Sequence, residues 1–248
     1  MFYGLDKNQY KILNHATGIV DSLYTKVFHG DMLITCERCL GFAEDKKFME
    51  ELNNLATNPQ EKSLMWRLHI QVWAAHHCLH LPGDFVECGV YKGFCSEFMV
   101  KYLNFEKQSK SLFLYDTFEG IPQQHRDGSP VREGAYKEEG LYESVVERFR
   151  PYPNVKVMKG VVPEIFSEVC PEQVAYLHLD LNSASAEIGA LEVLFDRLVP
   201  GGMIVFDDYG WEWYRAQKEA EDKFFAARDH KIMELPTGQG LLVKRGDA

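Results

Sequence analysis

Hydrophobic and polar positions follow two different patterns along the 248-residue chain. Up to about residue 55, apolar side chains recur at helical spacing, as in Phe48, Leu52 and Leu55, with charged residues between them. This stretch shows no strand pattern, and the polar residues 57–62 that follow it indicate a linker. The pattern therefore predicts a cap of amphipathic helices over residues 1–62, which we expect to help cover a binding site.

The rest of the chain, residues 63–248, predicts a second domain in which helices and short apolar strands alternate. The helices are expected at residues 64–81, 93–103, 141–149, 186–198 and 211–228, and residues 199–202 read as a helix-to-strand turn. The strands are expected at residues 84–88, 111–115, 155–158, 174–180, 202–208, 230–235 and 240–244. The last two are joined by too few residues for a crossover helix, so they should pair antiparallel. The predicted fold class is α/β: a doubly wound, Rossmann-like, seven-stranded sheet with its last strand antiparallel.

Acidic residues stand at the ends of two of these strands. Asp180 ends one apolar run, and Asp207 and Asp208 end the next. Because neighbouring parallel strands lie ~4.8 Å apart, carboxylates at their ends can converge on one hard cation such as Mg²⁺. Each of these residues could instead cap the helix that follows it. The close grouping of three like charges favours a metal or substrate site.

A glycine turn follows the first strand of the second domain. Glu87, Gly89 and Gly93 form an E-x-G-x-x-x-G pattern, and Asp116 ends the next strand. Such a turn lets backbone N–H groups meet an anionic ligand group, and an acid at the second strand end is suited to ribose hydroxyls. The pattern lacks the middle glycine of the dinucleotide fingerprint. It indicates a ligand that carries a nucleoside, without a pyrophosphate across the turn.

Charge and hydropathy exclude several classes of partner. The formal net charge is −10, so the chain has no basic footprint for nucleic acid. No apolar run approaches the ~20 residues of a spanning helix, and no export signal is evident, so we expect no membrane partner and a cytoplasmic location. A homodimer is compatible with the extra N-terminal helices.

Several segments of the chain resemble one enzyme family. They are residues 83–93 (GDFVECGVYKG), 115–122 (YDTFEGIP), 159–160 (KG), 177–180 (LHLD) and 200–210 (PGGMIVFDDYG). In these segments the chain resembles class I S-adenosylmethionine-dependent methyltransferases, specifically the macrocin O-methyltransferase family, whose metal-dependent members methylate sugar hydroxyls of natural products. The resemblance covers about residues 64–245, and the N-terminal helices match only loosely.

The resemblance implies a role for individual residues. Glu87, Gly89 and Gly93 would surround the methionine part of S-adenosylmethionine, Asp116 would hold its ribose, and Gly160 would lie near the adenine. Ser96 and Thr117 would also bind the cofactor. Asp180 would contact both the cofactor and Mg²⁺, with Asp207 and Asp208 as the other metal ligands. A divalent ion that binds a substrate diol would lower the pKa of a hydroxyl and fix its oxygen for methyl transfer.

One position departs from the family pattern. Family members usually carry a second acid two residues after the Asp180 equivalent, and this acid is the expected general base, whereas this chain has Asn182. An amide cannot take up a proton, so either another group such as His125 serves as base, or the nucleophile is acidic enough for the metal alone, or the reaction has changed. Asp180 and His125 are the candidate catalytic residues. The alternative for His125 is a solvated loop residue. His178, two residues before Asp180, reads as a hydrogen-bonded core residue.

Two further segments are expected to control access to the site. The loop over residues 119–140 exceeds the ~12–15 residues of ordinary connections, so it predicts a lid or a disordered segment, and we favour the lid. Trp211, Trp213 and Tyr214 could stack on an acceptor ring or pack against the sheet.

Together these features predict a magnesium-assisted O-methyltransferase that acts on a hydroxyl of a small molecule of sugar or natural-product type. The alternatives are a methyltransferase that needs no metal or acts on nitrogen, and a catalytically inactive S-adenosylmethionine-binding protein. The sequence does not identify the acceptor, because the expected lid elements are its least recognisable parts.

Overall fold

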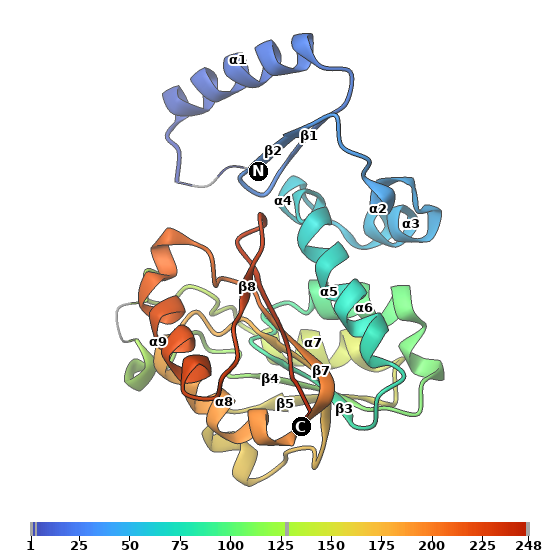
Figure 1. Ribbon diagram of the computed structural model, residues 1–248, viewed down its shortest axis with the longest axis vertical. Helices are drawn as coiled ribbons and strands as arrows, with labels where there is room; N and C mark the ends of the chain where they lie inside the picture. Colours follow the sequence, from blue (N-terminus) through green and yellow to red (C-terminus); the bar gives the residue numbers. More distant parts are fainter. Residues whose placement is uncertain (1, 3, 127–128, 247–248) are drawn as a thin grey trace. The chain divides into compact units, whose positions relative to one another are not determined.

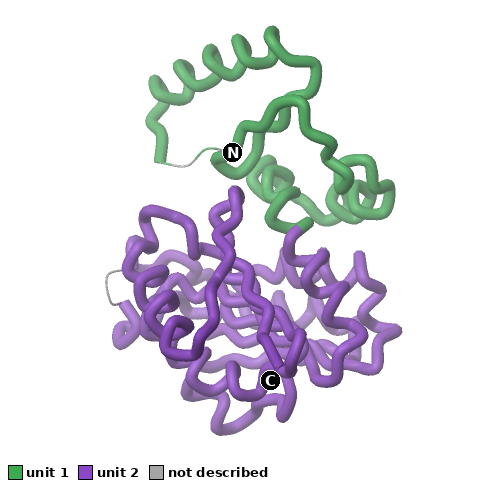
Figure 2. The backbone as a smooth tube through the Cα atoms, in the orientation of Figure 1, with its two compact units in different colours: residues 1–69 green, residues 70–248 purple. Residues whose placement is uncertain are grey.

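The structure, a computed structural model, describes residues 2, 4–126 and 129–246. The chain forms two compact units, Met1–His69 and Ile70–Ala248 (Figure 2). The sequence placed the corresponding boundary between residues 62 and 63. Residues 127–128 of the expected lid loop lie outside the described residues.

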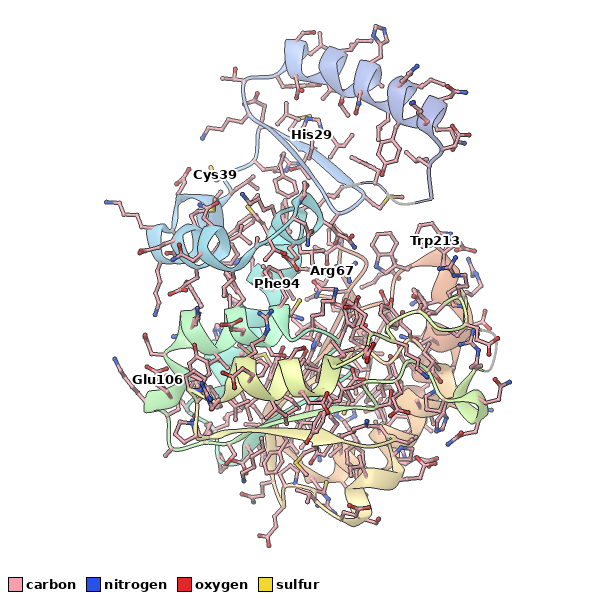
Figure 3. The ribbon with its side chains drawn as sticks, turned by 180° about the vertical axis from the view of Figure 1, so that it is seen from behind. His29, Cys39, Arg67, Phe94, Glu106 and Trp213 are labelled. Carbon is pink, nitrogen blue, oxygen red and sulfur yellow. The ribbon has the colours of Figure 1, made fainter. Side chains whose placement is uncertain are left out.

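The first unit contains helices and one hairpin. Its elements are α1 (Lys7–Leu23), β1 (Val27–Gly30), β2 (Leu33–Cys36), α2 (Gly41–Glu44), α3 (Lys46–Leu55), α4 (Pro59–Ser63) and the start of α5 (Met65–Cys78). The expectation of helix alone was wrong, because β1 and β2 pair antiparallel through a two-residue turn. Asp31 and Met32 form this turn with φ of 49° and 64°, and Asp31 accepts a hydrogen bond of 2.7 Å from Nε of Arg67, which Figure 3 labels.

The second unit contains the predicted seven-stranded sheet. Its strands are β3 (Asp84–Cys88), β4 (Leu112–Asp116), β5 (Val155–Lys159), β6 (Val174–Leu179), β7 (Leu198–Phe206), β8 (Met233–Glu234) and β9 (Gly240–Val243). Their order is β5-β4-β3-β6-β7-β9-β8. β9 pairs antiparallel with both β7 and β8, so it is the one strand of this sheet that runs against the direction of the other six. The predicted fold class is confirmed.

Helices cover both faces of this sheet. Figure 1 shows α6 (Phe94–Leu103) and α7 (Leu141–Phe149) on one side and α8 (Ala184–Arg197) and α9 (Arg215–Ala226) on the other. Because both faces are covered, all six residues of β6 are buried. Short 3₁₀ turns complete the unit: η1 (Phe105–Lys107), η2 (Gln123–His125), η3 (Glu164–Ser167) and η4 (Glu212–Tyr214).

Two local expectations in this unit were wrong. Residues 199–202 belong to β7 and form no separate turn. Val174 pairs with Leu198 and Tyr176 with Met203, so one residue of β6 lies opposite four residues of β7, which form a bulge. The helix expected from residue 211 begins only at Arg215, because η4 precedes it.

Chain order places a crevice at the centre of the sheet. The chain runs from β3 outward to β4 and β5 and then returns to β6 on the other side of β3. The connections after β3 and β6 therefore leave in opposite directions, and ligands bind at such a switch point in open α/β sheets. Among the described residues, no helix combines the length and apolar character that crossing a bilayer requires.

Candidate active site

A cavity lies at the carboxyl ends of β3, β4, β5 and β6. It encloses about 720 Å³ when the space that is open to solvent is included. Seven of the residues singled out from the sequence line it: Gly89, Asp116, Thr117, His125, Gly160, Asp180 and Asn182. The cavity thus lies where the switch point predicts it.

Gly89 brings the turn after β3 against the end of β6. Its φ is +90°, and a Cβ at this position would lie 1.9 Å from the carbonyl oxygen of Asp180. Only glycine allows this approach, since both the backbone conformation and the space exclude a side chain. Gly89 and Asp180 both line the cavity, and their close approach requires a residue without a Cβ at position 89.

Asp116 joins the end of β4 to the same turn. Its Oδ2 accepts hydrogen bonds from the backbone N–H groups of Val90 (2.7 Å) and Tyr91 (2.8 Å), and its Oδ1 accepts one of 2.7 Å from Phe118. A carboxylate offers about four acceptor positions, so these three bonds leave capacity for one ligand hydroxyl. Asp116 thus shapes the turn and presents an acceptor to the cavity.

Glu87, Gly93 and Ser96 do not line this cavity. Glu87 is only 4 % exposed, accepts a hydrogen bond of 2.6 Å from the Ser96 hydroxyl and lies 3.5 Å from Nδ1 of His178. Gly93 precedes α6 with φ of 75°. Their expected contacts with the cofactor stay a prediction.

His178 is buried as expected, but it also joins two acidic residues. Its Nε2 lies 3.6 Å from Oδ1 of Asp207 and 2.7 Å from the side-chain amide of Gln71. Burial alone would lower the pKa of His178, but the contacts with Asp207 and Glu87 outweigh it and raise the pKa to about 10. The raised pKa favours a protonated imidazole, which links β3, β6 and the end of β7.

The three acidic residues that follow β6 and β7, Asp180, Asp207 and Asp208, do not form a preformed metal site. Asp207 also accepts a hydrogen bond of 3.0 Å from Nε2 of Gln239, and both Asp207 and Asp208 are buried. Within residues 2, 4–126 and 129–246, no group of three or more His, Cys, Asp or Glu side chains is placed to hold a metal ion. The metal ligands expected from the sequence stay a prediction.

Tyr136 is a cavity residue that the sequence analysis missed. It comes from the loop between β4 and α7, lines the cavity with Asp180, and packs edge-on against Tyr91 with ring centroids 5.1 Å apart. Burial and the nearby charges of Asp180, Asp208 and Asp207 raise the pKa of its phenol, which therefore keeps its proton. Nothing in the sequence distinguishes it from other loop tyrosines.

His125, at the end of η2, also lines the cavity. Its Nδ1 is 2.9 Å from the hydroxyl of Ser185, and its buried Nε2 has no hydrogen-bond partner among the described residues, with Glu164 Oε2 3.8 Å away. The structure thus brings His125 and Asp180 to one cavity, as the sequence analysis expected of two candidate catalytic residues. Their roles stay a prediction.

A buried pair of acids lies between α8 and α9. Glu187 and Glu221 are both 0 % exposed, and one oxygen of Glu187 and both of Glu221 have no hydrogen-bond donor among the described residues. Glu187 Oε1 accepts a hydrogen bond of 3.0 Å from the N–H of Leu181. Burial raises the pKa of Glu221, and the charge of Glu187 raises it further. A proton held by Glu221 avoids a second negative charge beside Glu187 in this buried site.

We expect Glu221→Gln to stabilise the protein at alkaline pH. With its pKa raised in the folded state, Glu221 stabilises the fold below its ordinary pKa, and that stability is lost as the pH rises. The amide needs no proton, so the gain should be about 1–4 kcal/mol at pH 8 and should approach zero toward pH 4.3. Urea unfolding at several pH values measures it. Glu219→Gln, at an exposed position of α9, should show no such trend, and an equal trend in both variants would contradict the raised pKa of Glu221.

Comparisons with known proteins agree with this geometry. A model of the macrocin-O-methyltransferase (TylF) family matches residues 68–234. The chain is 31 % identical over 140 residues to a Streptomyces olivaceus protein, 8-demethyl-8-(2,3-dimethoxy-alpha-L-rhamnosyl)-tetracenomycin-C 4'-O-methyltransferase, covering 52 % of this chain and 54 % of that one. It is 26 % identical over 156 residues to mycinamicin III 3''-O-methyltransferase of Micromonospora griseorubida, covering 54 % and 60 %.

Solved structures show the same fold. The O-methyltransferase NovP superposes with a TM-score of 0.64 at 21 % identity, over 73 % of this chain and 81 % of its own. The calicheamicin methyltransferase CalS11 gives a TM-score of 0.59 at 17 % identity, over 80 % and 93 %. The chain spans between about half and three fifths of the length of the curated relatives described above. Because the family model matches well over half of the chain, the protein belongs to the macrocin O-methyltransferase family.

Proposed function

We propose that the protein transfers a methyl group from S-adenosylmethionine to a hydroxyl group of a small molecule of sugar or natural-product type. The observation that carries this proposal is the cavity at the switch point, in which the Gly89 turn, Asp116 and Asp180 meet. Family membership supports the reaction class. The relatives named above act on glycosylated natural products according to their names, which supports the acceptor class.

The cavity fits the cofactor. Gly160 lies on its wall between Asp116, to whose carbonyl oxygen it donates a backbone hydrogen bond of 2.9 Å, and the apolar Val161 and Val162. A flat base suits this apolar wall, and the remaining acceptor capacity of Asp116 suits a ribose hydroxyl. When bound, S-adenosylmethionine supplies an electrophilic methyl group. The residues of the chain hold the two reactants in line and accept the proton of the hydroxyl, for which we propose Asp180 or His125.

The donor chemistry of the acidic strand ends fits a magnesium ion. Asp180, Asp207 and Asp208 offer carboxylate oxygens, which are the ligands that Mg²⁺ prefers. The charges of all three raise the pKa of the Tyr136 phenol, which lines the cavity. We propose that these residues hold the ion. When bound, it would stabilise the negative charge that develops on the acceptor oxygen.

Incubation with methyl-labelled S-adenosylmethionine tests this function. Acceptors for the panel are TDP-rhamnose, methyl α-L-rhamnoside and a catechol, with calorimetry of S-adenosylhomocysteine binding in parallel. We expect binding and transfer of label to at least one hydroxyl. Binding without transfer would favour the inactive binding protein, and an absence of binding would refute the proposal. Removal of Mg²⁺ with EDTA should stop transfer, whereas unchanged turnover would favour the metal-independent alternative.

An aromatic pair next to the acidic site is suited to an acceptor ring. Trp211 and Trp213 are stacked, with ring centroids 5.6 Å apart and planes 5° apart, and Trp213 remains 50 % exposed beside the start of α9 (Figure 3). Trp211 is seated over Gly238, where a Cβ would lie 2.6 Å from its Nε1. We propose that the exposed face of Trp213 receives the ring of the acceptor.

We expect Trp213→Ala to raise the KM for TDP-rhamnose about two- to tenfold, because a ring contact contributes ~0.5–1.5 kcal/mol. The affinity for S-adenosylhomocysteine should not change. Steady-state kinetics and calorimetry measure the two quantities. Trp73→Ala removes a tryptophan of similar exposure, 44 %, on α5 and serves as the control. An unchanged KM in Trp213→Ala would contradict the role.

A further inference from the structure

The amide that replaces the usual second acid is part of a hydrogen-bonded chain that ends at Asp180. The hydroxyl of Tyr214 donates to Oδ1 of Asn182, and Nδ2 of Asn182 donates to Oδ1 of Asp180 at 3.0 Å. Tyr214 belongs to η4, which follows β7, whereas Asn182 and Asp180 follow β6. The chain of bonds therefore joins the segments that leave two neighbouring strands.

The direction of these bonds requires an amide at position 182. A primary amide accepts with its oxygen and donates with its nitrogen, so Asn182 can receive the tyrosine proton and donate to the carboxylate at the same time. An ionised aspartate at this position could accept from Tyr214 but could not donate to Asp180. The departure from the family pattern thus has a structural consequence: it replaces a proton acceptor with a bridge.

The bridge is held rigidly in the wall of the cavity. Asn182 is only 7 % exposed and has a φ of 56°, a left-handed conformation that asparagine tolerates better than most residues. Asn182 and Asp180 both line the cavity. A buried amide with a fixed backbone leaves the neighbouring carboxylate little rotational freedom, because one of its oxygens is tied to that amide.

We infer that Tyr214 and Asn182 are positioning residues that hold the Asp180 carboxylate in the orientation that meets the acceptor hydroxyl. This inference rests on the proposed function. Neither residue takes up a proton in this role; both act through Asp180. Loss of the bridge should therefore lower the rate of transfer and leave the cofactor bound, since the Gly89 turn and Asp116 are untouched.

Three variants test the inference. Tyr214→Phe removes only the hydroxyl, Asn182→Ala removes both the acceptor for Tyr214 and the donor to Asp180 without adding a base, and Glu212→Gln is the control in the same turn, because Glu212 is exposed and contacts Arg215. With TDP-rhamnose as acceptor, kcat should fall about ten- to a hundredfold in the first two variants. The Kd for S-adenosylhomocysteine should stay within about twofold. A kcat within twofold of the wild type in both variants would overturn the inference.

Crystal structures of the wild type and of Tyr214→Phe provide a readout that does not depend on turnover. We expect the Asp180 carboxylate to rotate or to occupy more than one orientation in the variant. A single, unchanged orientation would refute the positioning role. If the wild type transfers no methyl group, the proposed function fails, and the orientation of Asp180 still decides whether the bridge exists. Asn182→Ala, checked for a normal unfolding midpoint, repeats this test if Tyr214→Phe does not fold.

Discussion

A Gly89→Ala variant is expected to lose S-adenosylhomocysteine binding by more than about a hundredfold. The added Cβ would lie 1.9 Å from the carbonyl oxygen of Asp180 and 2.6 Å from its carbonyl carbon. Both are backbone atoms, which cannot rotate away as a side chain would. The turn after β3 and the end of β6 must therefore separate, and both line the cavity. Isothermal titration calorimetry measures the loss.

The same variant should be less stable than the wild type by about 2–4 kcal/mol, because overpacking and a left-handed alanine each cost ~1–3 kcal/mol. Gly140→Ala separates these causes, since Gly140 has a φ of +71° and no neighbouring heavy atom within 4 Å of the added Cβ. It should lose only about 1–2 kcal/mol in urea unfolding and should bind S-adenosylhomocysteine normally. Equal losses in the two variants would show that the close approach at Gly89 contributes little.

The sheet could be predicted because its strands carry a strong local signal. β6 is buried along its whole length, and β7 ends in a similar apolar run, so burial on both faces is visible as uninterrupted hydrophobic sequence. The hairpin of β1 and β2 was missed for the opposite reason. Each strand has only four residues, and the turn uses Asp31 and Met32, of which methionine is unusual at a positive φ.

The candidate site was only partly predictable. The residues that follow a strand can be identified from the local sequence, whereas the residues that contact them come from distant segments. Gly89, Asp116 and Asp180 follow apolar strands, and they line one cavity. Tyr214 and Gln239 reach Asn182 and Asp207 from segments 32 residues away in each pair, along connections whose course depends on strand order. The sequence pattern does not contain that order.

Buried charge was not predicted from the sequence. Glu187 stands three, four and seven residues before Ala190, Leu191 and Leu194, so it shares their helical face and is fully buried with them. His178 was expected in the core as a hydrogen-bonded residue, but its two acidic partners, Glu87 and Asp207, were not predicted. Pairing decides whether a buried ionisable group is tolerated, and pairing is a property of the assembled sheet.

The ion pairs of His178 lead to the prediction with the largest expected effect on stability. His178→Leu should lower the free energy of unfolding by about 3–5 kcal/mol, because it leaves two buried carboxylates without their shared cation. Glu87 and Asp207 are 4 % and 8 % exposed, and His178 lies 3.5 Å and 3.6 Å from them. The hydrogen bonds from Ser96 and Gln239 remain, but neither donor carries a charge.

Neutralising one of the two acids should recover part of this loss. In the background of His178→Leu, Glu87→Gln removes one of the two charges that had been paired with His178, so the double variant should be more stable than His178→Leu alone by about 1–3 kcal/mol. In the wild-type background the same Glu87→Gln change should destabilise the protein, because it breaks an existing pair. A double-mutant cycle in urea measures the coupling. Additive effects of the two changes would contradict an ionic bridge, whereas a reversal of sign between backgrounds requires one.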